Sequence, residues 1–446
     1  MPPRDRARPT AAAPRAVATA RASSPRRLAL FAVAALSLLV PLVFDARVGG
    51  HFRLPKTLLA QSLGLLSLLL LVLASRRLDA AALRRAFAAP ALAAAAPLVL
   101  VATALAAASS HPEHVARGLA GLWIAAACLV GWSQGFTREE LGRALAWTLP
   151  GAALSGLLGL VQALGLYQPF GFARDSTVAH ARFEVIGFAG NAGDLGASLV
   201  LPCLIAQARA AAGGLVWPIA AAVCALGVLA SQTVTAFAAL AVGSALLWLP
   251  RLTGRRWRSR ALAGLGAALL AALLVFAYGP ARERLLVKGE SLAEGDWNDL
   301  LSGRLDGWRA AVEMFKERPF TGVGQGAFRA AFVDAKAALL ERGAVFFEAQ
   351  PFPVFANAHN EPLEVAAETG LPGLLALGWA LWLLGRRLRA GVLGAAAGER
   401  TLAAAGLGAL ALLSLTGFPF RIAVVAFPAL LFLAWLLADP EAEAAP

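Results

Sequence analysis

Charged residues are scarce in this chain of 446 residues. They make up 15% of it, whereas hydrophobic residues make up 59% and the mean hydropathy is +0.67. A soluble protein of this size keeps roughly a quarter of its residues charged. The deficit argues against a soluble protein and is typical of a chain whose main solvent is lipid.

Cysteine is also rare. The three cysteines, Cys128, Cys203 and Cys224, all lie inside apolar segments, where cysteine acts as a small buried hydrophobe. No pair has the spacing of metal ligands, so the sequence supports neither a zinc site nor a disulfide framework.

The net charge of +13 raises the possibility of nucleic-acid binding. The arginines, however, occur in short runs between apolar stretches, such as Arg76-Arg77, Arg84-Arg85, Arg255-Arg256 and Arg386-Arg387. This is the pattern of cytoplasmic loops in a membrane protein, not of a basic face that reads bases. We therefore expect no nucleic-acid partner.

Apolar segments long enough to cross a bilayer recur along the chain. A hydrocarbon core of about 30 Å needs about 20 apolar residues per helix, and a scan at that length predicts about twelve transmembrane helices. They lie near 28–44, 57–74, 90–108, 118–134, 144–166, 193–209, 214–231, 233–250, 261–279, 362–385, 398–416 and 421–438. The first resembles the apolar region of a signal peptide, but no A-x-A site follows, so we expect it to stay as a helix.

Basic residues concentrate in alternate loops, which predicts that both termini are cytoplasmic. The expected organisation is a disordered basic tail at 1–27, nine membrane helices within 28–279, an outer loop at 280–361, three more helices within 362–438, and a second tail at 439–446. The fold class is thus an all-α polytopic membrane protein.

The segment 280–361 is long and comparatively polar. Loops longer than about 15 residues are usually functional or disordered. This one shows amphipathic helical spacing in two stretches, one through Trp308, Ala311, Val312 and Phe315, the other through Phe328, Phe332, Ala335 and Leu339. Pro319 should end the first helix, which could lie on the membrane surface, and Gly322, Gly324 and Gly326 should form a tight connection.

Arg304 lies one turn before Trp308 and shares its apolar stripe. An arginine on a buried face needs an anionic partner, because an unpaired buried charge is costly. The anionic partner of Arg304 can be a substrate. It can equally be Asp306 or Glu313 in a salt bridge, or a lipid phosphate.

His359 directly precedes the tenth predicted membrane helix. A histidine at the outer boundary can accept a proton and meet a membrane-anchored substrate, although a cap or a packed residue explains it equally. Glu364 and Glu368 follow at i, i+4 spacing and are candidates as carboxylates near the membrane. Asn191 and Asp194 open the sixth helix and can both act as caps.

Together these residues resemble the O-antigen ligase and polymerase superfamily. His359-Asn360 through Glu368, Gly370 and Gly373 read H-N-x-x-L-x-x-x-x-E-x-G-x-x-G. Upstream, the chain matches the pattern R-x-x-x-W…F…P-x-x-G-x-G…F at Arg304, Trp308, Phe315, Pro319, Gly322, Gly324 and Phe328. Arg182, Gly187 and Asn191 resemble a third motif of that family, but Gly193 and Asp194 stand where a second asparagine is usual.

The resemblance implies a membrane-embedded glycosyltransferase of the GT-C-like kind at the bacterial inner membrane, with its active face periplasmic. Its donor would be a glycan on undecaprenyl pyrophosphate, and its acceptor, in the ligases, the lipid A–core sugar. Arg182 and Arg304 would hold the pyrophosphate, and His359 would deprotonate or orient the acceptor hydroxyl. Asn360, Glu368, Asn191 and Trp308 would support them. The resemblance implies no metal and no cofactor, and the reaction would invert the anomeric centre.

Two alternatives remain open. A polymerase or a protein O-oligosaccharyltransferase of the same superfamily would use the same donor with a different acceptor. A polysaccharide transporter is the third reading, but transporters tend to have broken helices at the midplane, whereas here the polar residues gather toward one outer face.

Overall fold

The structure is a computed structural model. It describes residues 24–48, 50–75, 87–170, 185–210, 213–252, 277, 279–346, 355–389 and 397–438. Every regular element within these ranges is a helix. The first part of the chain contains α1 Ser24–Leu39, α2 Arg53–Ala74, α4 Pro90–Ala104, η1 Ala106–Ala108, α5 Pro112–Gly135, α6 Arg138–Ala146, α7 Thr148–Ala163, α8 Ala192–Ala210, α9 Val216–Ala230, α10 Val234–Trp248 and η4 Leu249–Leu252. The second part contains α12 Gly279–Glu294, α13 Trp297–Leu300, α14 Arg304–Glu317, α15 Phe328–Glu341, α16 Glu361–Arg389, α17 Ala397–Thr416, η5 Pro419–Arg421 and α18 Ala423–Leu437.

Each apolar segment predicted to cross the membrane overlaps a helix, except 261–279, nearly all of which lies outside the described residues. Within the described part, five helical stretches are long and apolar enough to cross a membrane. They are Arg53–Ala74, Pro90–Ala108, Pro112–Gly135, Arg138–Ala163 and Glu361–Arg389. An all-α membrane fold is therefore confirmed, whereas the number of about twelve crossings stays a prediction.

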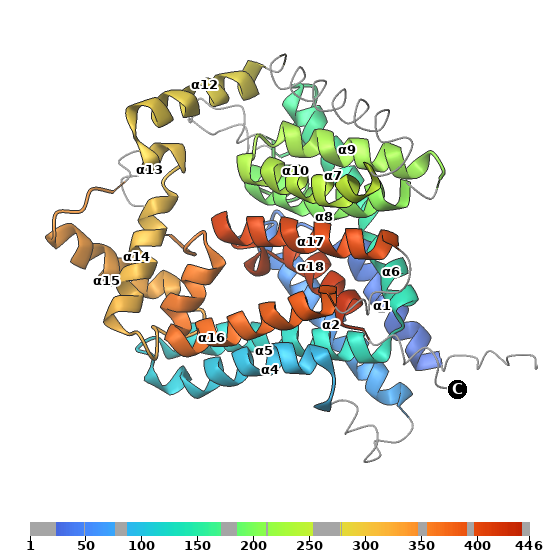
Figure 1. Cartoon of the computed structure of the whole chain (residues 1–446), viewed down its shortest axis with the longest axis horizontal. Helices are drawn as coiled ribbons and strands as arrows, with labels where there is room; N and C mark the ends of the chain where they lie inside the picture. Colours follow the sequence, from blue (N-terminus) through green and yellow to red (C-terminus); the bar gives the residue numbers. More distant parts are fainter. Residues whose placement is uncertain are drawn as a thin grey trace, which may run out of the picture.

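The helices form two groups with α17 and α18 between them (Figure 1). One group contains α7, α8, α9 and α10, and the other contains α4, α5 and α16. Helix α8 packs against α7, α9, α10, α17 and α18, and its residues are buried almost continuously from Ala192 to Ala206. Because of this central position α8 is buried on all its faces, as expected for a helix without a wet face.

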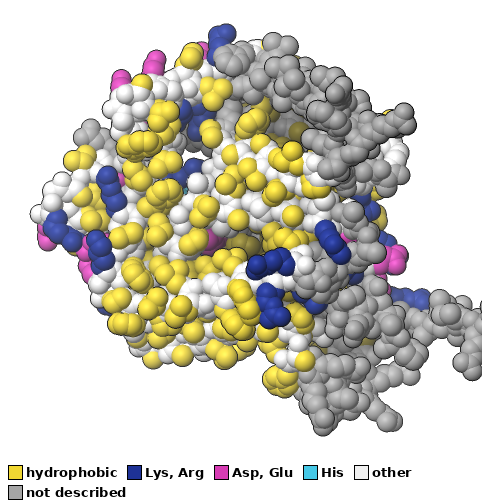
Figure 2. Space-filling view, viewed as in Figure 1, with side chains coloured by type: hydrophobic (Ala, Val, Ile, Leu, Met, Phe, Trp, Pro, Cys, Tyr) yellow, Lys and Arg dark blue, Asp and Glu magenta, His cyan; other side chains and the backbone are white. Residues whose placement is uncertain are grey.

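Large apolar side chains cover much of the exterior. On α2 alone, Leu58, Leu65, Leu69 and Leu73 are each about half exposed. Figure 2 shows hydrophobic side chains spread over the viewed face, with few basic or acidic groups among them. A soluble monomer rarely exposes apolar area on this scale. With the apolar helices, this surface makes the chain a multi-pass membrane protein.

Helices α12 to α15 lie at one end of the bundle (Figure 1). The predicted helices in this segment are confirmed as α14 and α15. The buried face of α14 is rotated from the predicted stripe, because Ala310, Ala311 and Met314 are buried whereas Val312 is exposed. That face packs against α15 and α16, so protein rather than lipid covers it.

Helix α16 has a sharp break at Gly370, where φ is 64° and ψ is −160°. Pro372 follows and has no N–H to donate to the carbonyl of Glu368. The segment after Pro319 replaces the missing hydrogen bonds: Val323 N donates to Ala367 O and Gly324 N to Glu368 O, both at 2.9 Å. The break therefore fixes the glycine-rich connection against α16.

Candidate active site

His359 lies in the turn that leads into α16. Its φ is +57°, a left-handed conformation that is uncommon for non-glycine residues. Its ring packs edge-on against Phe418 and Phe355, with centroids 4.6 Å and 5.7 Å apart. Trp308 Nε1 donates a hydrogen bond to the His359 carbonyl at 3.3 Å. The backbone and ring of His359 are thus held by three aromatic residues from separate segments.

Arg304 is the first residue of α14, directly after Gly303 in the left-handed region. Its Nη1 donates to Thr235 Oγ1 at 3.3 Å, at the start of α10. The acidic partners considered from the sequence are engaged elsewhere: Asn298 Nδ2 donates to Asp306, and Glu313 pairs with Arg342. Within the described residues Arg304 has no ion pair, so its charge is available to an anion.

Burial and the neighbouring guanidinium charges keep the imidazole of His359 neutral. Burial, Arg304 and Arg53 together lower the pKa of His359 from 6.5 to about 3. Burial also lowers the pKa of Arg304, and the guanidinium of Arg284 lowers it further. Guanidinium groups that repel one another in a partly buried site favour an anionic ligand, since an anion would offset the repulsion.

Arg53, at the start of α2, was not among the residues singled out in the sequence. Its Nε and Nη2 donate to Asp194 at 3.0 and 3.1 Å, and its guanidinium lies 5.5 Å from the centre of the Phe418 ring. The side chain remains 48% exposed although Asp194 is buried. Arg53 therefore presents charge toward His359 while it is anchored to α8.

The carboxylates of α16 surround Arg421. Arg421 Nη2 lies 2.5 Å from Glu368 Oε2, and its Nε lies 3.2 Å from Glu364 Oε1. The acidic groups raise the pKa of Arg421 further above its ordinary value, against the effect of burial. Glu368 and Glu364 thus have a basic partner within the protein.

Glu364 also fixes the segment before His359. It accepts hydrogen bonds from Asn357 Nδ2 at 2.7 Å and from Ala358 N at 2.9 Å. Because Arg421 holds Glu364 from the other side, the connection between α17 and α18 is linked to the turn that carries His359. This relationship joins residues distant in sequence, and the sequence did not indicate it.

The remaining predicted residues have local roles in the structure. Asn360 accepts from Leu363 N at 3.0 Å as a cap of α16, and its Nδ2 donates to Leu415 O at 2.9 Å. Asn191 accepts from Gly193 N at 2.7 Å, so its contacts are those of a cap of α8. Arg182 lies outside the described residues.

One signal in the sequence could have identified Arg53 and Arg421, the two arginines that the sequence analysis did not single out. Basic residues are sparse in the short loops expected outside the membrane, against the bias that the positive-inside rule produces. Arg53 and Arg421 both belong to that sparse set. A basic residue in a short outer loop is therefore a candidate functional residue, as is a basic residue inside an apolar segment.

Residues 219–378 match the family described as O-antigen ligase. This range includes Arg304, Trp308, His359, Asn360 and Glu368, and extends from α9 to the middle of α16. No curated protein matches the chain. The match covers about a third of the chain and supports its resemblance to the O-antigen ligase superfamily.

Proposed function

We propose that this protein transfers a glycan from undecaprenyl pyrophosphate to a hydroxyl of the lipid A–core sugar, at the periplasmic face of the inner membrane. The observation that carries the proposal is a neutral His359 imidazole beside Arg304, which has no ion pair within the described residues. A general base next to an anion site is what transfer from a sugar pyrophosphate requires.

Arg304 would contact the donor pyrophosphate, and Arg182 would contribute a second guanidinium. Such contacts can be bidentate, and they stabilise the charge that develops on the leaving group. The acceptor oxygen would attack the anomeric carbon as the bond from that carbon to the pyrophosphate oxygen breaks. Undecaprenyl pyrophosphate leaves with the bonding electrons, and the anomeric centre is inverted without a metal.

His359 would take the proton of the acceptor hydroxyl. In the ligand-free protein its pKa of about 3 makes it a weak base, because burial first, and then Arg304 and Arg53, disfavour the imidazolium. A bound pyrophosphate would offset both guanidinium charges and so raise the pKa of His359 by the part of the shift that these charges cause, while the effect of burial remains. Donor binding would therefore prepare the base for the acceptor.

Deletion of the gene, followed by gel analysis of lipopolysaccharide, tests the proposal. We expect the long-chain ladder to disappear while lipid-linked polymer accumulates. Products with a single repeat would instead indicate a polymerase, and an unchanged ladder with loss of protein glycosylation would indicate a protein O-oligosaccharyltransferase. A ladder and protein glycans that both stay unchanged would contradict the proposal.

A further inference from the structure

The end of α17 and the connection that follows it contact the turn that carries His359. Leu415 O, in the last turn of α17, accepts a hydrogen bond from Asn360 Nδ2 at 2.9 Å. The ring of Phe418 packs edge-on against the His359 ring, with centroids 4.6 Å apart. The end of α17 is therefore fixed against the His359 turn, although it lies outside the matched range 219–378.

Thr416, the last residue of α17, links the same segment to Arg304. Its hydroxyl donates to Thr235 Oγ1 at 3.1 Å and also lies 3.3 Å from Leu412 O, one turn back in its own helix. Thr235 Oγ1 in turn accepts a hydrogen bond from Arg304 Nη1 at 3.3 Å. A hydroxyl oxygen has two lone pairs, so Thr235 can accept from both donors at once. Hydrogen bonds therefore connect Thr416 through Thr235 to the guanidinium of Arg304.

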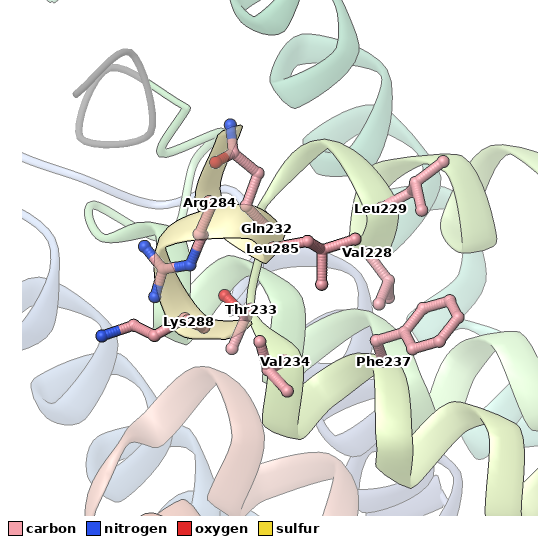
Figure 3. A pocket seen from close by; sticks show the side chains of 9 residues that line it. All are labelled: Val228, Leu229, Gln232, Thr233, Val234, Phe237, Arg284, Leu285 and Lys288. Carbon is pink, nitrogen blue, oxygen red and sulfur yellow. The ribbon is translucent and has the colours of Figure 1, made fainter. Parts of the chain in front are cut away.

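Thr235 is a rigid support, because the start of α10 lies against three other helices. Thr233 Oγ1 donates to Ala192 O at the start of α8, at 3.1 Å, and α10 packs along α17. In Figure 3 Thr233 and Val234 lie beside the part of α12 that carries Leu285. Threonine is β-branched, which restricts its χ1 angle. The backbone of α10 therefore determines where the Thr235 hydroxyl lies.

A guanidinium that is already held loses less entropy when it contacts a ligand. Arginine has a long side chain, and fixing its rotamers is costly. The bond to Thr235 uses one N–H of the Arg304 guanidinium and leaves others to a ligand. Because the segment that supports Thr235 also packs on His359, the two candidate groups are set at a defined spacing. Such spacing matters, since a displacement of about 1 Å can slow a reaction about one-hundred-fold.

We propose that Thr235 and Thr416 are positioning residues of the transfer reaction, which hold the Arg304 guanidinium at a fixed distance from His359. This inference rests on the proposed function and adds to it two residues that act through another side chain. Thr416 also extends the site to the end of α17, beyond the matched range. A threonine with a purely structural role would affect stability, whereas a positioning residue affects the rate through Arg304.

Kinetics of glycan transfer by the purified full-length protein test the proposal, with the acceptor that the wild type uses. Thr235→Val should lower kcat about ten- to one-hundred-fold, because it removes a hydrogen bond to a charged group. Thr416→Val should lower kcat about two- to tenfold, because the hydrogen bond that it removes joins two neutral groups. The KM for the acceptor should stay within about twofold in both variants, since Arg304 acts on the donor.

Thr401→Val is the matched control, because Thr401 lies on the same helix as Thr416 and its hydroxyl donates to Gly398 O, a local carbonyl. It should transfer glycan at the rate of the wild type. Thr235→Ser and Thr416→Ser should recover most of the lost rate, since serine restores the hydroxyl. Thermal unfolding of each variant shows whether a lower rate reflects misfolding.

A double variant shows whether Thr416 acts through Arg304. Once the guanidinium is absent, Thr416→Val should have no further effect, so the double variant should transfer at the rate of Arg304→Gln alone. An equal loss of rate from Thr416→Val with and without Arg304 would overturn the inference, because the threonine would then act elsewhere. Rates for Thr235→Val and Thr416→Val equal to that of Thr401→Val would also overturn it.

The choice of acceptor separates this inference from the proposed function. If the wild type transfers glycan to the lipid A–core sugar and Thr235→Val is as fast as Thr401→Val, only the positioning inference fails. If the wild type instead uses a growing glycan or a protein as its acceptor, and Thr235→Val slows that transfer while Thr401→Val does not, only the proposed function fails.

Discussion

Arg421 and Glu368 form a close ion pair, with Nη2 2.5 Å from Oε2, and the same guanidinium reaches Glu364. The two carboxylates belong to one helix, and the arginine belongs to the connection between two others. Since Glu364 also holds Asn357 and Ala358, the geometry of the His359 turn depends on Arg421.

Replacement of Arg421 by Gln should destabilise the protein by about 3–5 kcal/mol, because it leaves two buried carboxylates without a counter-charge. Thermal unfolding of the purified protein measures the effect. Arg143→Gln is the control, as the exposed pair of Arg143 with Glu139 should contribute less than about 1 kcal/mol. Equal unfolding temperatures for the two variants would contradict the structural role of Arg421.

Gly322→Ala should disrupt the contact between the glycine-rich connection and α16. A Cβ at Gly322 would lie 2.3 Å from the Glu368 carbonyl carbon, and its φ is +62°. Gly343 has a φ of +82° but open space around it, so Gly343→Ala should show only the conformational cost of about 1–2 kcal/mol. Thermal unfolding should therefore show a larger loss for Gly322→Ala, and similar losses would mean that the contact contributes little.

Arg304→Gln should lower the rate of glycan transfer about one-hundred-fold or more, because it removes a charge that stabilises the leaving pyrophosphate. Its abundance in the membrane should stay near that of the wild type. Arg309→Gln provides the comparison on the same helix, since Arg309 is exposed and, among the described residues, its side chain hydrogen-bonds the Val345 carbonyl. Transfer by Arg304→Gln at the rate of Arg309→Gln would remove Arg304 from the donor site.

His359→Asn should fold and yet transfer no glycan. Asparagine tolerates the left-handed conformation at this position, so the turn is retained while the base is lost. An in vitro transfer assay, with thermal unfolding as the check on folding, measures both properties. A transfer rate close to that of the wild type would show that His359 is not the base.

His359 should also make stability depend on pH. Its pKa is about 3 in the folded protein against 6.5 ordinarily, so between these values the unfolded chain binds the additional proton. Stability should thus decrease as the pH falls from 6.5 toward 3. His359→Asn should reduce this decrease when unfolding temperatures are compared across that range, and identical profiles would contradict the lowered pKa.

The sequence by itself determined which of the described segments are helical. Each long apolar run has to satisfy its backbone hydrogen bonds internally once water is absent, so its helical state follows from local composition. The same local spacing predicted α14 and α15 and the connection between them. The resemblance to the family then identified Arg304 and His359 as candidate site residues. In the structure Arg304 contacts Thr235 at the start of α10, and His359 lies just before the start of α16.

Only the tertiary structure decided which charges meet. Arg53 with Asp194, and Arg421 with Glu364 and Glu368, are pairs between distant helices, and no local pattern encodes them. The break of α16 at Gly370 also depends on tertiary contacts. The carbonyls that it leaves free accept hydrogen bonds from the backbone N–H groups of Val323 and Gly324, which belong to another segment. Such pairings depend on how helices pack, which sets distances between residues that sequence spacing leaves undefined.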